Sequence, residues 1–340
     1  MVKIKSRSIS VLGGGSWGST IAQHLTTLNH KVTLYHRNAD QLHEMEEKLK
    51  HPFLEELKFS ESINFIDDLN NLPESEYLII GVPSHGVRDL MEKIPEKFLN
   101  AIIINLSKGI EINTFKRMSE VILENPKINL DRVVTLSGPS HAEEVALGQP
   151  TTLVAASNNI HSCIEVQKLL SSKSLRIYAN TDIIGVELGG SIKNVIALAS
   201  GVCDGIGFGD NTKSALITRG IVEISRLGVS LGGKPETFAG LSGIGDLIAT
   251  CLSRHSRNRY VGEQIGLGRP LNEVTNEMSM IAEGVKTSVA VKELSDKNNI
   301  EMPIVSSMYS ILYQNLDPKD AVNSLMNRDL VNERELIFSP

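Results

Sequence analysis

The chain has 340 residues, of which 41% are hydrophobic and 22% charged, and its formal net charge is -6. This composition excludes a disordered chain, and the length favours two domains over one. The acidic balance argues against a general nucleic-acid partner, because binding to a phosphate backbone requires a clustered positive surface.

Short β-rich runs alternate with helix-compatible stretches through the first half of the chain. The predicted strands are Ser8 to Leu12, Val32 to Tyr35, Tyr77 to Val82, Ile102 to Leu106, Val133 to Ser137 and Thr152 to Ala156. Alternation of this kind predicts an α/β Rossmann-type fold with a doubly wound, mostly parallel sheet. Longer helical runs dominate after about Asn180. We therefore expect a dinucleotide-binding Rossmann domain over residues 1–181 and an all-helical substrate and catalytic domain over residues 182–340.

The first predicted strand runs directly into a GxGxxG motif made by Gly13, Gly15 and Gly18, and a helical pattern follows. Gly13 permits the tight turn, Gly15 lets backbone N–H groups approach a pyrophosphate, and Gly18 lets the helix pack closely on the strand. The motif lies between a strand and a helix at the start of the chain, which favours dinucleotide binding over a purely structural glycine turn.

The second predicted strand ends with Tyr35, His36 and Arg37, and no carboxylate precedes Asp40. An acidic residue at this point normally binds the ribose 2′-hydroxyl of NAD, whereas an arginine accommodates the 2′-phosphate of NADP. We therefore expect the cofactor to be NADP(H), alone or alongside NAD(H). The alternative is that Arg37 is a solvated loop charge.

Lys193 lies in the apolar run Ile183 to Ser200, in which Glu187 and Asn194 are the other strongly polar residues. A lysine in such a run needs a partner or a function, because lysine is almost never buried unpaired. We expect its side chain to project over Gly189 and Gly190, which would leave room for a ligand. Desolvation would lower its pKa toward the range of a general acid. The alternative is a lysine whose ammonium reaches solvent.

Lys108 and Asp246 are two further candidates. Lys108 follows a predicted strand at the carboxyl edge of the sheet, where ligands bind in open α/β folds, although an ordinary surface lysine fits equally well. Asp246 follows a glycine-rich turn. It is either a helix N-cap, or a residue that orients Lys193 or binds a substrate hydroxyl.

Three arginines, Arg254, Arg257 and Arg259, precede a short predicted helix over Tyr260 to Ile265. A helix N-terminus already carries partial positive charge, so the cluster indicates an anion that compensates it. Ser256 and Asn258 add neutral donors, a combination that suits phosphate. The alternative is arginines exposed to solvent or paired with acids.

The remaining features are expected absences. Cys163, Cys203 and Cys251 lie far apart without CxxC spacing, which indicates neither a disulfide framework nor a zinc site, and no metal is expected. We find no signal-peptide core and no stretch that approaches transmembrane length. We therefore expect a soluble, cytoplasmic protein without membrane insertion.

Taken together, these motifs closely resemble bacterial NAD(P)-dependent sn-glycerol-3-phosphate dehydrogenases over almost all of the chain. The motifs that carry the resemblance are Gly13 to Gly18, Asn105 to Gly109, Ser137 to Ala142, Val186 to Ala199, Leu241 to Thr250, Arg254 to Arg259 and Ala282 to Gly284. Two residues depart from the family pattern: Gly14 stands where alanine is common, and Ser140 where threonine is common.

The resemblance implies reduction of dihydroxyacetone phosphate, a phosphorylated triose, to sn-glycerol 3-phosphate for phospholipid synthesis. It implies a homodimer whose second domain is similar to that of 6-phosphogluconate dehydrogenases. Lys193 would donate and accept the proton. The implied substrate contacts are Lys108, Gly138, Ser140, Lys193, Asp246, Ser256, Arg257 and Asn258. The implied cofactor contacts are Ser16, Trp17, His36, Arg37, Lys108, Ala142, Arg257, Ile281 and Glu283, beside the glycines of the loop.

Two rival functions follow from the same residues. A related two-domain NADP reductase would act on a carboxylated substrate, since carboxylate also binds arginine well. A dinucleotide-sensing regulator would perform no chemistry at all, and a functional Lys193 distinguishes an enzyme from such a regulator.

Overall fold

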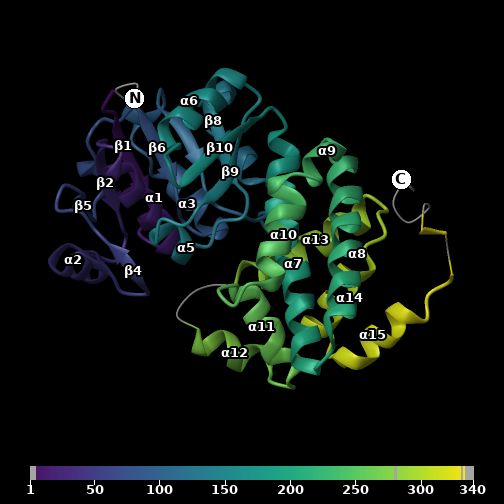
Figure 1. Ribbon diagram of the computed structural model, residues 1–340. Helices are drawn as coiled ribbons and strands as arrows, with labels where there is room; N and C mark the ends of the chain where they lie inside the picture. Colours follow the sequence, from purple (N-terminus) through teal and green to yellow (C-terminus); the bar gives the residue numbers. More distant parts are fainter. Residues whose placement is uncertain (1–4, 279–281, 331, 334–340) are drawn as a thin grey trace. The chain divides into compact units, whose positions relative to one another are not determined.

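The computed structural model describes residues 5–278, 282–330 and 332–333, and its contacts divide the chain into two compact units (Figure 1). The first unit holds the chain up to Lys108 together with Met118–Ile183. The second holds Gly109–Arg117, here called the crossing segment, together with the chain from Ile184. The chain therefore passes between the units at three points. The packing of the crossing segment with the second unit was not predicted from the sequence.

The first unit contains an eight-stranded sheet with the order β10-β9-β8-β7-β6-β1-β2-β5. All neighbouring strands are parallel except β8 and β9, so the predicted Rossmann-type class with a mostly parallel sheet is confirmed. The strands are β1 (Ser8–Leu12), β2 (Lys31–Tyr35), β5 (Asn64–Ile66), β6 (Tyr77–Ile80), β7 (Ile102–Asn105), β8 (Val133–Ser137), β9 (Thr151–Ala156) and β10 (Leu175–Asn180). A separate hairpin is formed by β3 (Lys50–His51) and β4 (Leu54–Lys58).

Two apolar clusters cover the two faces of this sheet. Successive residues of a strand point to opposite faces, so Ile79 of β6 belongs to one cluster and Ile80 to the other. Helices α1 (Ser16–Thr27) and α6 (Ile160–Leu170) contribute to the first cluster, and α3 (Val87–Glu92) and α4 (Met118–Ile122) to the second. The remaining helical elements of this unit are α2 (Ala39–Lys48), α5 (Ala142–Ala146), η1 (Leu69–Asn71), η2 (Ser84–Gly86), η3 (Glu96–Phe98) and η4 (Leu130–Arg132).

The second unit is helical, as the sequence predicted. Its elements are α7 (Ile183–Ile206), α8 (Asp210–Ser230), α9 (Pro235–Phe238), the π-helical turn η5 (Leu241–Gly245), α10 (Asp246–Leu252), α11 (Arg257–Gly266), α12 (Leu271–Glu277), α13 (Glu283–Lys297), α14 (Pro303–Tyr313) and α15 (Pro318–Met326). One apolar cluster fills this unit, and α7 contributes more residues to it than any other helix.

Helix α7 is long and apolar enough to cross a membrane, so the expectation that no stretch approaches that length was wrong. Its 24 residues have a mean hydropathy of 1.3 in the most apolar window, of which 94% is buried within the structure. A helix that is apolar on all sides is expected in the centre of a helical domain, where other helices surround it. This burial accounts for the composition of α7.

Helices α7 and α11 cross with their backbones in direct contact. A Cβ at Gly262 of α11 would come within 1.9 Å of the Leu198 carbonyl oxygen, and a Cβ at Gly201 of α7 within 1.9 Å of the Arg259 carbonyl oxygen. Only glycine allows the helices to approach so closely. The crossing fixes the first turn of α11 against the part of α7 that carries Lys193.

The crossing segment is held on the helical unit by its own side chains. Ile110 is buried in the apolar cluster of that unit, and the ring of Phe115 packs against the same cluster with the Lys297 ammonium 3.8 Å from its centre. Arg117 forms a 2.6 Å ion pair with Glu187 of α7. The segment is therefore an integral part of the second unit.

Candidate functional site

The glycine-rich loop joins β1 to α1 in a conformation that needs glycine at two positions. Gly13 has φ +125, and a Cβ there would come within 2.6 Å of the Gly81 carbonyl carbon. A Cβ at Gly18 would lie 2.1 Å from the Gly13 carbonyl oxygen. Gly15 differs, because a Cβ there would meet nothing within 4 Å. Packing within the protein therefore explains why Gly13 and Gly18 are glycines. Gly15 instead borders open space, in which the protein backbone could approach a phosphate of a bound dinucleotide.

The N-terminus of α1 suits the pyrophosphate of a dinucleotide. Gly15 is the N-cap residue and offers no side-chain acceptor, and the first turn contains no acidic residue. Ser16 and Trp17 open the helix, and Trp17 packs on the apolar cluster of the sheet. Helix N-terminal N–H groups bind anions, so the residues present fit a bound dinucleotide.

At the end of β2, His36 and Arg37 lie where an adenosine ribose would be recognised. His36 Nε2 lies 2.8 Å from the side-chain oxygen of Gln41, and Arg37 is exposed. Burial raises the pKa of the Tyr35 hydroxyl, with smaller contributions from Arg37, which lowers it, and Asp68, which raises it. The segment that follows the unpredicted strand β5 thus brings the Asp68 carboxylate near the end of β2, an acid that the local sequence after β2 does not show.

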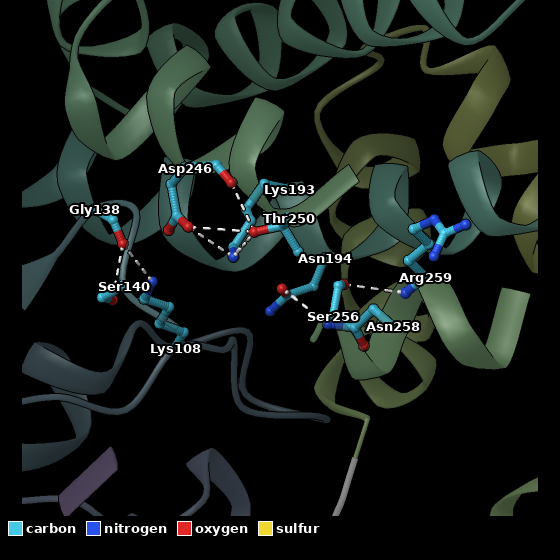
Figure 2. A network of polar contacts seen from close by, with 10 residues as sticks. All are labelled: Lys108, Gly138, Ser140, Lys193, Asn194, Asp246, Thr250, Ser256, Asn258 and Arg259. Carbon is cyan, nitrogen blue, oxygen red and sulfur yellow. Dashed lines mark hydrogen bonds and ion pairs between the residues drawn. The ribbon is translucent and has the colours of Figure 1, made fainter. Parts of the chain in front are cut away.

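Lys108, Gly138 and Ser140 meet at the carboxyl ends of the neighbouring strands β7 and β8 (Figure 2). The Lys108 ammonium and the Ser140 hydroxyl both donate to the Gly138 carbonyl oxygen at 3.0 Å. Gly138 has φ +127, which disfavours any other residue. Ala142 begins α5 and packs into the apolar cluster beside the sheet.

Lys193 is buried in the helical unit, with 5% of its surface exposed, and it is paired (Figure 2). Its ammonium donates to Asp246 Oδ1 at 2.9 Å and to the hydroxyl of Thr250. Asp246 is 1% exposed, and Thr250 donates to the Asp246 carbonyl oxygen at 2.6 Å. Asp246 and Thr250 are four residues apart on α10, so their side chains share one face of the helix. Of the roles considered for Asp246, the structure therefore shows a contact with Lys193.

The expected space above Gly189 is not empty. A Cβ at Gly189 would come within 2.6 Å of the Ser242 carbonyl oxygen, so the backbone of η5 fills that position. The expectation that Gly189 leaves room for a ligand was wrong, because close packing of two backbones explains this glycine instead.

Helix α11 begins at Arg257, three residues earlier than predicted, and two of the predicted residues make hydrogen bonds at its start. Ser256 is the N-cap residue and accepts from the Arg259 N–H at 3.2 Å. Asn258 donates from Nδ2 to Asn194 Oδ1 at 3.0 Å, and its Oδ1 accepts from the Gly284 N–H at 2.9 Å. Asn258 thus connects the first turns of α11 and α13 to α7, and Figure 2 shows its contact with Asn194.

The three arginines of the cluster differ in their surroundings. Arg259 forms a 2.6 Å ion pair with Asp204 and a 3.7 Å pair with Glu263. Its charge is therefore compensated within the helical unit, as the alternative interpretation held. Arg254 and Arg257 are exposed.

Two predicted cofactor residues lie around the start of α13. Glu283 is its first residue and is half-buried. Ile281 lies outside the described residues. Among the residues that the structure describes, no group of three or more histidine, cysteine, aspartate or glutamate side chains could hold a metal ion.

Known proteins match both units. The family model described as "NAD-dependent glycerol-3-phosphate dehydrogenase N-terminus" matches residues 8–163, and the one described as the C-terminus of the same enzyme matches residues 182–323. A glycerol-3-phosphate dehydrogenase (NAD(P)+) of a Thermoanaerobacter species is 49% identical over 327 residues, which cover 96% of this chain and 98% of the relative. The relative of Chlorobium phaeobacteroides with the same name is 48% identical over 94% of this chain and 98% of its own length.

The chain belongs to the NAD(P)-dependent glycerol-3-phosphate dehydrogenase family. The crystal structure of glycerol-3-phosphate dehydrogenase from Coxiella burnetii is 35% identical to it, covers 95% of this chain and 99% of that chain, and superposes with a TM-score of 0.89. As a member of this family, the chain is an oxidoreductase that uses NAD or NADP.

The two departures from the family pattern have local explanations. A Cβ at Gly14 would lie 3.0 Å from the His36 side chain, so an alanine here would require the imidazole to move by a few tenths of an ångström. Ser140 uses its hydroxyl to reach the Gly138 carbonyl, a bond that threonine makes with the same group.

Two polar residues that contact the candidate site residues were not predicted as such from the sequence. Thr250 contacts Lys193, and Asn194 holds Asn258. Both carried a weak signal: Thr250 lies four residues after Asp246, and Asn194 is a polar residue in an apolar helix. Their partners lie 57 and 64 residues away in sequence, so only the fold brings them together.

Proposed function

We propose that the chain interconverts dihydroxyacetone phosphate and sn-glycerol 3-phosphate with NAD(P)(H), and that Lys193 is its general acid and base. The observation that carries this proposal is the buried ammonium of Lys193, held by the Asp246 carboxylate and the Thr250 hydroxyl. Such an arrangement holds a protonated amine that can donate to a carbonyl oxygen. Membership of the dehydrogenase family supports the same reaction.

In the direction of reduction, the nicotinamide when bound supplies a hydride to the carbonyl carbon. Lys193 donates a proton to the carbonyl oxygen, which would otherwise carry the developing negative charge. In the reverse direction, Lys193 accepts the proton of the alcohol. Asp246 stabilises the ammonium and fixes its direction.

The substrate phosphate would bind at the start of α11. Arg257 would provide a charged donor, and the Ser256 hydroxyl still has a proton to donate while it accepts from the Arg259 N–H. Asn258 would contribute the second proton of its amide, since one already goes to Asn194. Lys108, Gly138 and Ser140 form the other proposed group of substrate contacts.

The cofactor would be held by the loop of Gly13, Gly15 and Gly18 with Ser16 and Trp17, and its adenosine end by His36 and Arg37. An exposed arginine at the end of β2 supports use of NADP(H) beside NAD(H). The further proposed contacts are Lys108, Ala142, Arg257, Ile281 and Glu283. We propose residues 1–181 as the dinucleotide-binding domain, apart from the crossing segment, which packs with the helical unit. Residues 182–340 are the proposed substrate and catalytic domain. We also propose a homodimer that works in the cytoplasm without membrane insertion and supplies glycerol phosphate for phospholipid synthesis.

The direct test mixes the purified chain with NADPH or NADH and dihydroxyacetone phosphate and follows the absorbance of the reduced nicotinamide. Comparing kcat/KM for the two cofactors measures their preference. Consumption with ketopantoate but not with dihydroxyacetone phosphate would favour the related reductase of carboxylated substrates. Dinucleotide binding without turnover of either compound would favour a sensing regulator.

Replacing Arg257 with alanine tests the phosphate site. Loss of a hydrogen bond to a charged group costs about 1.5 to 3 kcal/mol, which we expect to raise KM for dihydroxyacetone phosphate roughly tenfold to a hundredfold. The matched control is Arg269→Ala, which removes the same charge from an exposed pair with Glu277 in the same unit. An Arg257→Ala variant with the KM of the control would contradict the phosphate role.

A further inference from the structure

His51 joins the β3–β4 hairpin to the glycine-rich loop. Its imidazole is buried, with 4% of the residue exposed, and Nε2 lies 3.2 Å from the Gly14 carbonyl oxygen. The hairpin itself is anchored, because Leu54 and Leu57 of β4 belong to the apolar cluster that also contains α1. His51 therefore links the loop to a fixed part of the first unit.

Both ring nitrogens of His51 have a partner, which determines the tautomer. The Phe53 N–H donates to Nδ1 at 3.2 Å, so Nδ1 must carry a lone pair. Nε2 then carries the proton and donates it to the Gly14 carbonyl. Burial lowers the pKa of His51, and so does the nearby His36, while the bond to Gly14 opposes the change. The neutral form with a proton on Nε2 satisfies every one of these contacts.

The loop needs such a link because Gly13, Gly14 and Gly15 follow one another. Glycine loses more conformational entropy on ordering than any other residue. A binding loop that is already ordered avoids that loss when the ligand arrives. The Gly13 N–H is held by the Tyr35 carbonyl at 3.0 Å, and the Gly15 carbonyl accepts from the Ser19 N–H at 2.9 Å. The bond from His51 to Gly14 fixes the peptide between them.

We infer that His51 is a positioning residue for the cofactor: its Nε2–H holds the Gly14 peptide so that the loop is ordered before the dinucleotide pyrophosphate binds. The inference deepens the proposed function and depends on the loop being the dinucleotide site. His51 itself touches neither the substrate nor the reacting atoms. Its effect is therefore on cofactor affinity, and it is equal for NADPH and NADH because the pyrophosphate is common to both.

Two variants of His51 separate the bond to the loop from the bond within the hairpin. His51→Gln places an amide N–H near the position of Nε2 and retains a donor toward Gly14. His51→Asn places its amide near the position of Nδ1 and leaves the Gly14 carbonyl without the donor. We expect His51→Asn to raise the Kd of both NADPH and NADH by about threefold to tenfold, the range for one neutral hydrogen bond. We expect His51→Gln to stay within about twofold of the parent.

The measurement is titration of the full chain with NADPH and with NADH, read by nicotinamide fluorescence without substrate, with Tm recorded for each apoprotein. We also expect kcat at saturating cofactor, and KM for dihydroxyacetone phosphate, to stay within about twofold of the parent in both variants. Equal Kd values in the parent and His51→Asn would overturn the inference. The inference would also be overturned if both variants lost cofactor affinity equally with a parallel fall in Tm. A loss of affinity for NADPH but not for NADH would overturn it as well. Because the binding assay contains no substrate, failure to reduce dihydroxyacetone phosphate would refute the proposed function and leave this inference standing.

Discussion

Replacing Lys193 with methionine is expected to lower kcat for dihydroxyacetone phosphate by roughly a hundredfold to ten-thousandfold, the range for a lost general acid. Methionine has a similar length but cannot donate a proton to the carbonyl oxygen. Cofactor affinity is expected to persist, because Lys193 contacts Asp246 and Thr250 and is not among the residues proposed to hold the dinucleotide. Steady-state kinetics and titration with NADPH measure the two quantities separately.

The same substitution leaves the Asp246 carboxylate buried without its ammonium, so loss of folding must be separated from loss of chemistry. Lys193→Met with Asp246→Asn removes the unpaired charge and serves as the folded reference. Lys193→Arg retains a positive charge toward Asp246, but a guanidinium does not release its proton at neutral pH. If Lys193 is the acid, the double variant and Lys193→Arg both bind NADPH, and both keep a kcat far below that of the parent. Turnover near the parent rate in Lys193→Arg would show that only the charge matters, and turnover near the parent rate in Lys193→Met would remove Lys193 from the reaction.

Buried strands were the part of the fold that the sequence predicted well. Strands β6, β7 and β8 are buried along their whole length and are mostly apolar, so they stand out from their surroundings. The edge strands β5 and β10 were missed for the opposite reason. Strand β5 has three residues and no buried one, and β10 alternates buried and exposed residues over only part of its length. An exposed edge leaves little apolar pattern to detect.

Single residues of the candidate site could be predicted from the sequence, but the residues that they contact could not. A lysine in an apolar helix indicated that Lys193 needs a compensating group, and the structure supplies Asp246 from a position 53 residues away. The same reasoning was wrong for Gly189, because an absent side chain indicates close packing of a neighbouring backbone as readily as space for a ligand. Arg259 shows the corresponding limit for charge clusters, since its partner Asp204 belongs to another helix.

Replacing Arg117 with alanine is expected to destabilise the helical unit by about 3 kcal/mol, the lower end of the range for removing one partner of a buried ion pair. The Glu187 side chain is 3% exposed, so it loses its partner in a place that water hardly reaches, while Arg117 is 15% exposed. Burying an unpaired carboxylate costs more than the ion pair itself contributes. The matched control is Arg328→Ala, which removes an arginine from an exposed pair with Glu301 and is expected to cost about 0 to 1 kcal/mol.

The single tryptophan allows the loss to be assigned to one unit. Trp17 belongs to the first unit, so its fluorescence during urea unfolding reports on that unit, while far-UV circular dichroism is dominated by the helical one. Arg117→Ala should move the circular dichroism transition to lower urea and move the Trp17 transition less. Arg117→Met with Glu187→Leu should restore most of the stability, because an apolar pair of similar volume carries no desolvation penalty. Equal shifts of both transitions would mean that the crossing segment stabilises the two units alike. An unshifted circular dichroism transition would mean that solvent compensates the charge of Glu187 despite its burial.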